Sequence, residues 1–174
     1  MSARRILCLS GSLRRQSANT AALLAAQRLA PRGLWLELYA ALGELPPFNP
    51  DIEAAGVPAV VAELRARVAA ADALLIACPE YAHGVPGAFK NLLDWLVGAV
   101  EFPCKPVLVL NTSARGSHYA QDALLEILRT MSARLIVPAP HVVALPACGC
   151  TVSDVLADPQ RCAELESALA ALMP

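Results

Sequence analysis

The stretch Arg4-Arg5-Ile6-Leu7-Cys8-Leu9-Ser10-Gly11-Ser12-Leu13-Arg14-Arg15-Gln16-Ser17-Ala18-Asn19-Thr20 decides the fold class. Its opening residues, 4–9, form a short apolar run that predicts a buried strand. Residues 17–30 are rich in alanine and leucine and predict a helix, which Pro31 and Gly33 end. A buried strand, a polar loop and a helix in this order make up the repeating unit of parallel α/β sheets.

The same unit recurs along the chain. Further strands are predicted at residues 34–39, 73–78, 106–110 and 135–137, the last with or without 141–144. Further helices are predicted at residues 58–71, 88–97, 119–131 and 159–172. The sequence therefore predicts a single α/β domain over residues 1–174, a doubly wound sheet of five parallel strands with helices on both faces. Ligands in such folds bind beyond the carboxyl ends of the strands, so the loops after strands one, three and four should carry the function.

Composition narrows the class of protein. The chain has 174 residues, is 56% hydrophobic and has a formal net charge of -1, which gives no electrostatic case for binding nucleic acid or an anionic membrane. The apolar runs are too short to span a bilayer, and the first one is too short for the core of a signal peptide. We therefore expect a cytoplasmic protein.

Six cysteines raise the question of a redox or metal site. Cys8 and Cys78 lie in apolar strand-like runs, where cysteine behaves as a small hydrophobic residue. Cys148-Gly149-Cys150 could mark a redox or metal site, but it lacks the Cys-x-x-Cys spacing and a second pair of ligands. No metal site is expected.

The first loop has the character of a phosphate site. It lies between a strand and a helix, where free backbone N–H groups and the helix dipole favour an anion. Ser12, Ser17 and Asn19 add hydrogen-bonding side chains, and Arg14 can hold phosphate oxygens with two N–H groups. The loop is neither a Walker loop nor a Gly-x-Gly-x-x-Gly motif. The alternative is a plain helix cap by Ser17 beside solvated arginines, but a cap needs one such residue and the loop has four.

The loop after strand three, Pro79-Glu80-Tyr81-Ala82-His83-Gly84-Val85-Pro86-Gly87, suits a flat ligand with polar edges. Its glycines and prolines fix a loop path that can turn backbone groups toward a ring such as isoalloxazine. Glu80 and His83 could form an acid/base pair, although a structural glutamate and a surface histidine are the favoured interpretation. A serine nucleophile is excluded because the chain has no Gly-x-Ser-x-Gly elbow.

At these loops the sequence resembles the NADPH-dependent FMN reductase family, which has a flavodoxin-like fold and includes chromate, quinone and azo-dye reductases. The segments that carry the resemblance are Gly11-Ser12-Leu13-Arg14 with Ser17 and Asn19, Leu45-Pro46-Pro47-Phe48-Asn49, Pro79-Glu80-Tyr81 with Pro86-Gly87, and Lys90-Asn91 with Asp94-Trp95. Their order and spacing make the resemblance more specific than any one of them.

The resemblance implies a flavin site. The FMN phosphate would be held by the first loop, at Ser12, Leu13, Arg14, Ser17, Ala18 and Asn19. The ring and ribityl chain would be bordered, largely through backbone, by Pro79, Glu80, Tyr81, Ala82 and His83, with Ser113 at the far edge of the ring. The resemblance also implies a homodimer or homotetramer, with Lys90 and Asp94 pairing with each other or across the subunit boundary.

Two departures from the family pattern bear on the site. Ala82 follows Tyr81 where the family often has asparagine, so any side-chain contact from that asparagine is missing. The loop Asn111-Thr112-Ser113-Ala114-Arg115-Gly116 has fewer glycines than in many members. Arg115 could meet a nucleotide phosphate or could be solvated.

The resemblance implies an enzyme that passes hydride from NADPH or NADH through bound FMN to a small acceptor, such as a flavin, a quinone, an azo compound or a metal oxyanion. No side chain need be catalytic, because the cofactor supplies the chemistry. An electron carrier of the flavodoxin type and a non-catalytic FMN-binding module are the alternatives. Electron carriers tend to be strongly acidic, and the net charge of -1 argues against the first.

Overall fold

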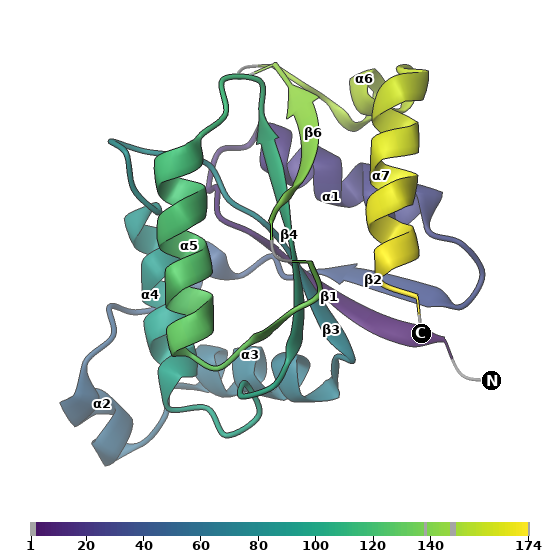
Figure 1. The fold of residues 1–174 in the computed structure, drawn as a ribbon. Coiled ribbons are helices and arrows are strands. Elements are labelled where there is room, and N and C mark those ends of the chain that lie inside the picture. Colours follow the sequence, from purple (N-terminus) through teal and green to yellow (C-terminus); the bar gives the residue numbers. More distant parts are fainter. Residues whose placement is uncertain (1–2, 138, 147–148, 174) are drawn as a thin grey trace.

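The computed structural model describes residues 3–137, 139–146 and 149–173, and its centre is a parallel sheet (Figure 1). The strands are β1 (Arg4–Ser10), β2 (Leu34–Leu38), β3 (Ala73–Ala77), β4 (Pro106–Ser113), β5 (Arg134–Leu135) and β6 (His141–Leu145). They lie in the order β2-β1-β3-β4-β5, and β6 also pairs with β4. The winding direction therefore reverses between β1 and β3, which is where a ligand crevice opens in folds of this kind.

Helices cover both faces of the sheet (Figure 1). They are α1 (Ala18–Leu29), the 3-10 turn η1 (Leu42–Glu44), α2 (Pro50–Ala55), α3 (Ala59–Ala70), α4 (Gly87–Val97), α5 (His118–Thr130), α6 (Val152–Leu156) and α7 (Pro159–Ala171). One core cluster joins the sheet to α3, α4 and α5, and the other joins it to α1, α6 and α7. In the described part of the chain, no helix has both the length and the apolar character needed to cross a bilayer.

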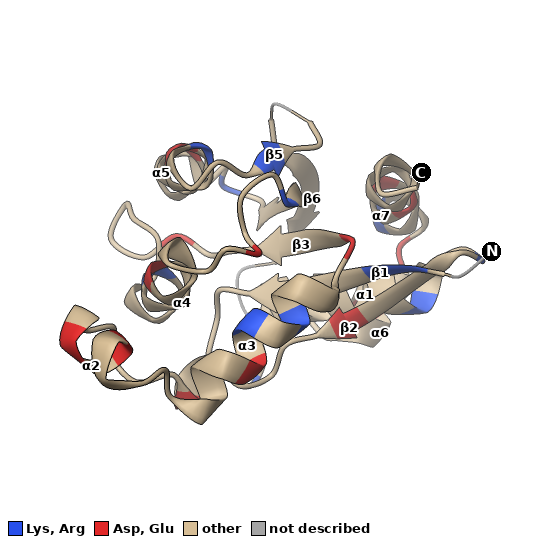
Figure 2. Cartoon of the chain, turned by 90° about the horizontal axis from the view of Figure 1, so that it is seen from below, with Lys and Arg blue, Asp and Glu red and all other residues tan. Residues whose placement is uncertain are grey.

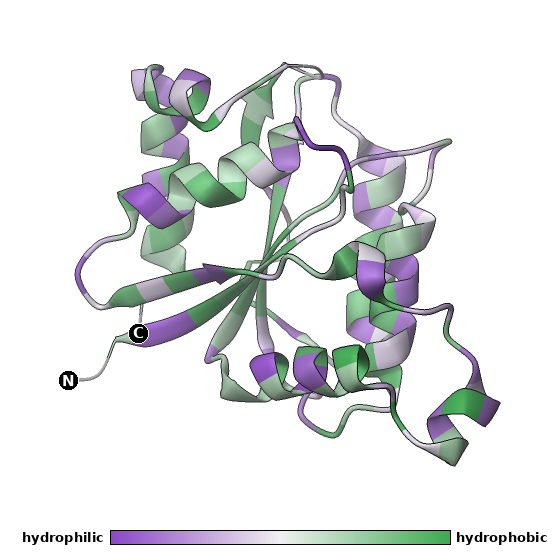
Figure 3. Ribbon diagram, turned by 180° about the vertical axis from the view of Figure 1, so that it is seen from behind, coloured by the Kyte–Doolittle hydropathy of each residue, from purple (hydrophilic) through white to green (hydrophobic). Residues whose placement is uncertain are grey.

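The two cores follow from strand geometry. Successive side chains on β1 point to opposite faces, so Leu7 and Leu9 enter one cluster while Ile6 and Cys8 enter the other. The central strands are apolar on both faces (Figure 3), as expected for a covered parallel sheet. Charges of both signs lie on the outer helices (Figure 2).

The structure corrects the predicted end of strand four. Residues 111–116 were expected to form a loop, but β4 continues to Ser113 because β6 pairs with it at Leu110, Asn111 and Ser113. The predicted fifth strand is divided. Its first part, β5, pairs with Pro106 and Val107, and its second part, β6, pairs with the far end of β4.

Two short helices were absent from the prediction. In the proline-rich segment, Asn49 accepts a hydrogen bond from the Asp51 N–H at 2.9 Å and begins α2. Near the C-terminus, Thr151 and Asp154 form a capping box that begins α6. Both helices are about a turn and a half long, which is too short for an apolar period to show in the sequence.

Candidate functional site

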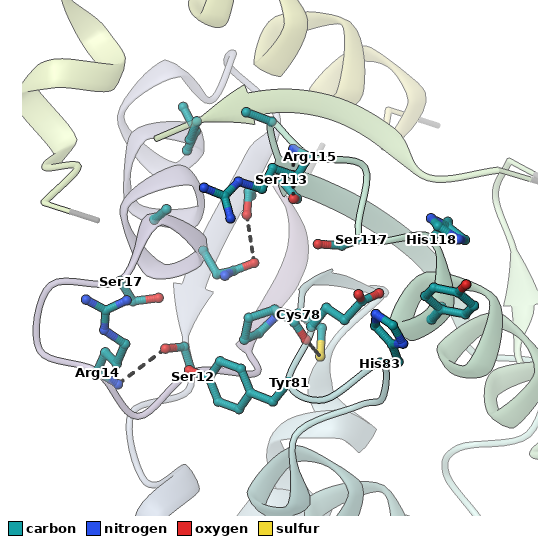
Figure 4. A pocket seen from close by; sticks show the side chains of 18 residues that line it. Ser12, Arg14, Ser17, Cys78, Tyr81, His83, Ser113, Arg115, Ser117 and His118 are labelled. Atoms are coloured by element: carbon teal, nitrogen blue, oxygen red, sulfur yellow. Dashed lines mark hydrogen bonds between the residues drawn. The ribbon is translucent and has the colours of Figure 1, made fainter. Parts of the chain in front are cut away.

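A cavity of about 600 Å³ opens at the carboxyl ends of β1, β3 and β4, and Figure 4 shows the 18 side chains that line it. Its volume is in the usual range for a small-molecule or cofactor site. Most of its lining comes from the segments that follow β1, β3 and β4, which are far apart in sequence and adjacent in space because these strands are neighbours in the sheet.

The loop after β1 is built from small hydroxyl side chains. The Ser12 N–H donates to Ser10 Oγ at 3.4 Å, and the Arg14 N–H donates to Ser12 Oγ at 3.3 Å. Ser17 caps α1 by accepting from the Thr20 N–H at 3.3 Å. The other N–H groups of the first turn have no carbonyl partner within the helix, which makes this end of the cavity suited to an anion.

A buried hydrogen bond fixes Asn19 at the same end of the cavity. The Thr112 hydroxyl on β4 donates to Asn19 Oδ1 at 2.9 Å, and both residues are buried. This bond ties the first turn of α1 to the end of β4. The bond therefore connects the segments that follow β1 and β4 at this end of the cavity.

Gly11 lets the first and second loops approach each other. A Cβ at this position would lie 2.7 Å from Cys78 Sγ and 3.1 Å from Pro79 Cδ. The Gly11 N–H also donates to the Ala77 carbonyl at 2.8 Å. A residue with a side chain would push apart these two loops, both of which contribute to the cavity lining.

The loop after β3 forms a tight hairpin, residues 81–84, which we call the rim hairpin. Tyr81 and Gly84 exchange two backbone hydrogen bonds, of 3.1 and 3.0 Å. The two residues between them, Ala82 and His83, have φ angles of 50° and 58°. Both central residues of a type I′ turn have positive φ, a conformation that L residues other than glycine adopt at a cost.

Glu80 is a structural residue in this loop, as favoured from the sequence. Its Oε2 accepts a hydrogen bond from the Ala120 N–H at 2.9 Å, in the first turn of α5. The N-cap residue of α5, Ser117, is left-handed and makes no capping bond with its side chain. A carboxylate is favoured at this place by the helix dipole. Glu80 thus caps α5 from a different loop.

Aromatic rings line the side of the cavity opposite the first loop (Figure 4). The rings of His83 and Tyr119 are stacked, with centroids 4.2 Å apart and an interplanar angle of 27°. The ring of His118 lies 4.1 Å from that of Tyr119 at 36°. Tyr119 is 48% exposed, so this stack forms part of the cavity mouth.

The loop after β4 is held by Asn111. Its Nδ2 donates to the Gly116 carbonyl at 2.5 Å, and its Oδ1 accepts from the Ser113 N–H at 3.0 Å. The Arg115 N–H donates to Ser113 Oγ at 3.2 Å, and the Arg115 side chain lines the cavity. The fixed loop therefore presents a cation to the cavity without needing more glycines.

Most residues predicted from the sequence meet at this cavity. Ten of the twelve line it: Ser12, Arg14, Ser17, Ala18, Asn19, Pro79, Glu80, Tyr81, His83 and Ser113. Leu13 and Ala82 are not among the lining residues. Leu13 is 61% exposed, and Ala82 is in the rim hairpin. Lys90 and Asp94 pair with each other within α4 at 2.5 Å.

Several lining residues were missed by the sequence reasoning: Cys78, Thr112, Ala114, Ser117, His118, Tyr119 and Leu145. Most of them lie at the end of β4 and the start of α5. If strand four had been predicted to its full length, these residues would have been expected at the carboxyl edge of the sheet, beside the other lining residues. Leu145, at the end of β6, had no comparable signal.

The described cysteines bear on the redox or metal role that the sequence left open for Cys148 and Cys150. Burial raises the pKa of the Cys78 thiol to about 12, so Cys78 is a neutral thiol at physiological pH. Among the residues that the structure describes, no group of histidine, cysteine and acidic side chains could hold a metal ion. Cys150 is buried, and Cys148 lies outside the described residues.

The strand order and the loop-lined crevice at the β1/β3 switch point define a flavodoxin-like α/β protein. A flavodoxin from Pseudomonas aeruginosa has the same fold, with a TM-score of 0.58 and 19% identity over 97% of this chain and 98% of that one. The chain belongs to the NADPH-dependent FMN reductase family, whose model matches residues 4–147.

Individual relatives agree with this assignment. The chain is 43% identical over 112 residues to an NAD(P)H-dependent FMN reductase of Pseudomonas aeruginosa, covering 63% of this chain and 60% of that protein. It is 32% identical over 111 residues to a quinone reductase of Escherichia coli, covering 62% and 59%. The matches thus span about 60% of these relatives' length. The structure of the flavoenzyme NAD(P)H:(acceptor) oxidoreductase FerB from Paracoccus denitrificans superposes with a TM-score of 0.79, 26% identity and 97% coverage of both chains.

Proposed function

We propose that the protein binds FMN in the 600 Å³ cavity and transfers electrons from NADPH or NADH to a small acceptor. The observation that carries this proposal is that one cavity has two chemically different ends. Hydroxyls, first-turn N–H groups and Arg14 suit a phosphate at one end, and the rim hairpin suits the edge of a flat ring at the other. Family membership supports the same cofactor.

The phosphate would be held by Ser12, Arg14 and Ser17, with Asn19 braced by Thr112. Leu13 and Ala18 would contribute backbone groups only. Arginine holds phosphate oxygens with two charged N–H groups, and serine adds neutral ones. Gly11 keeps this loop against the second one, so that phosphate and ring contacts keep a fixed separation.

The ring would be bordered by Pro79, Glu80, Tyr81, Ala82 and His83, mainly through their backbone, and by Ser113 at its far edge. The half-exposed Tyr81 offers an aromatic surface to one side. Bound FMN would supply the hydride chemistry, because it can accept two electrons and pass them on. The chain's own residues would bind the flavin, orient it and shield it from water, and none would need to form a covalent bond.

The acceptor would be a small molecule: a free flavin, a quinone, an azo compound or a metal oxyanion. The names of the relatives favour flavins and quinones. We further propose that the protein acts in the cytoplasm as a homodimer or homotetramer, with no nucleic-acid or membrane partner. Sedimentation analysis would test the assembly.

The deciding experiment is an absorbance spectrum of purified protein that has been supplemented with FMN and desalted, followed by NADPH under anaerobic conditions. Retained flavin absorbance that bleaches on adding NADPH is the expected result. Retained flavin that does not bleach with either nucleotide would favour an electron carrier or a non-catalytic module. Loss of all flavin on desalting, together with no oxidation of either NADPH or NADH in the presence of added FMN, would refute the proposal.

A further inference from the structure

The rim of the cavity contains three residues other than glycine in the left-handed region. Ala82 and His83 in the rim hairpin have φ of 50° and 58°, and Ser117 before α5 has φ of 44°. For residues other than glycine, the left-handed conformation is higher in energy than the ordinary helical or extended ones. Conformations of this kind persist only where surrounding contacts hold them. The rim hairpin must therefore be held by its contacts with neighbouring residues.

The hairpin's own hydrogen bonds are few. They are the two backbone bonds between Tyr81 and Gly84, and a two-stranded turn of this size is not stable by itself. The hairpin has two further contacts with α5. Glu80, directly before it, accepts from the Ala120 N–H, and His83, at its tip, stacks on Tyr119 at 4.2 Å.

Of these contacts, only the ring stack involves one of the two strained residues. Stacked aromatic rings attract one another beyond the surface they bury. Tyr119 lies in the first turn of α5, so its backbone belongs to a regular helix, and its ring also contacts that of His118 at 4.1 Å. Figure 4 shows His83 and His118 on this side of the cavity, away from Ser12 and Arg14.

We propose that Tyr119 is a positioning residue: by stacking on His83 it holds the rim hairpin in its strained conformation and thereby sets the affinity of the cavity for the flavin ring. The inference rests on the proposed FMN site and adds a residue that neither the sequence motifs nor the family resemblance assigns. Tyr119 acts through His83 and leaves the phosphate end untouched. Its loss should therefore weaken the binding of every ligand with the same ring by one common factor.

The first test follows backbone hydrogen exchange in the full chain, with and without FMN. The amides of Tyr81 and Gly84 report directly on the hairpin, because they donate its two hydrogen bonds. Tyr119→Ala should speed their exchange roughly two- to tenfold, the range that corresponds to a stacked aromatic pair. Tyr119→Phe keeps the ring and should match wild type. His118→Ala removes a ring that pairs with Tyr119 rather than with His83, and should leave these two amides protected.

The second test separates the ring from the phosphate by comparing the dissociation constants of FMN and riboflavin, which lacks the phosphate. Tyr119→Ala should weaken both by the same factor, roughly two- to tenfold, and Tyr119→Phe should restore both. Arg14→Ala should weaken FMN alone. Adding Ala82→Gly to Tyr119→Ala should recover part of the protection and part of the affinity, because glycine adopts positive φ without penalty.

The outcomes separate the two hypotheses. If wild type binds neither flavin, the proposed function fails, while faster exchange in Tyr119→Ala would still support its hold on the hairpin. If wild type binds FMN, three results would each overturn the positioning role: unchanged exchange in Tyr119→Ala, an unchanged dissociation constant for both flavins, or a loss confined to FMN. Equal weakening of both flavins with faster exchange would support it.

Discussion

Replacement of Gly11 by alanine should disturb the whole cavity although Gly11 does not line it. The added Cβ would lie 2.7 Å from Cys78 Sγ and 3.1 Å from both Cys78 Cα and Pro79 Cδ. Non-bonded carbon atoms pack best at about 3.5–4.0 Å. Two of the close atoms belong to backbone or to a proline ring, so rotation of a side chain cannot relieve the contact. The loops after β1 and β3 must therefore separate by several tenths of an ångström.

The expected cost follows from this geometry. Inserting a methyl group into a packed site destabilises proteins by about 1–3 kcal/mol. Cys78→Ala removes the sulfur that makes the shortest contact and leaves the two contacts at 3.1 Å. The double variant should therefore recover about 1 kcal/mol relative to the sum of the single effects, a coupling typical of residues in direct contact.

The assay is urea unfolding of the flavin-free protein, together with FMN titration. Both are carried out on wild type, on Gly11→Ala, on Cys78→Ala and on the double variant. Gly87→Ala is the matched control, because a Cβ there meets nothing within 4 Å although Gly87 begins a helix beside the same loop. We expect Gly11→Ala to lose stability and FMN affinity together, and Gly87→Ala to lose neither. A Gly11→Ala variant as stable as Gly87→Ala, or one whose cost is unchanged by Cys78→Ala, would refute the steric reasoning.

Three further predictions concern the same cavity. Ser12→Ala combined with Arg14→Ala should weaken FMN binding at least about tenfold, because the phosphate loses a neutral and a charged partner, and should leave riboflavin binding unchanged in the same titration. Thr112→Val should cost about 1–3 kcal/mol in urea unfolding, because it leaves a buried amide oxygen on α1 without its donor, whereas Thr112→Ser should retain most of the stability. In the flavin-free protein at pH 8, iodoacetamide should modify the exposed Cys104 and spare Cys78, because burial raises the pKa of Cys78 to about 12 and little thiolate forms. Mass spectrometry of the peptides would report both sites, and rapid modification of Cys78 would contradict the buried placement.

Local sequence signals were enough for the main elements of the fold. The apolar runs that became β1 and β3 are buried on both faces, so their hydrophobic character needs no partner to be recognised. Ser17 caps α1, a role that the sequence pattern offered only as the alternative to phosphate binding. Short α2 and α6 were not recognised, because their stability depends on caps rather than on a repeated apolar face.

The ends of the elements depended on neighbours. β4 extends to Ser113 because β6 pairs with it there, and a strand's length cannot be read from one strand when its partner supplies the hydrogen bonds. In the candidate site, too, some features follow from the local sequence and others depend on contacts with distant elements. The lining residues of its first loop, Ser12, Arg14, Ser17 and Asn19, could be predicted because they lie close together in the sequence.

The sequence by itself determined the alternation of strands and helices and the chemical character of the loops after β1 and β3, since these depend on residues close together in the chain. Only the tertiary structure decided how those loops are held. Glu80 reaches the Ala120 N–H across 40 positions, Thr112 reaches Asn19 across 93, and Tyr119 meets His83 from another element. These contacts exist because β3 lies between β1 and β4 in the sheet, and that order is fixed by the packing of all the strands and helices together.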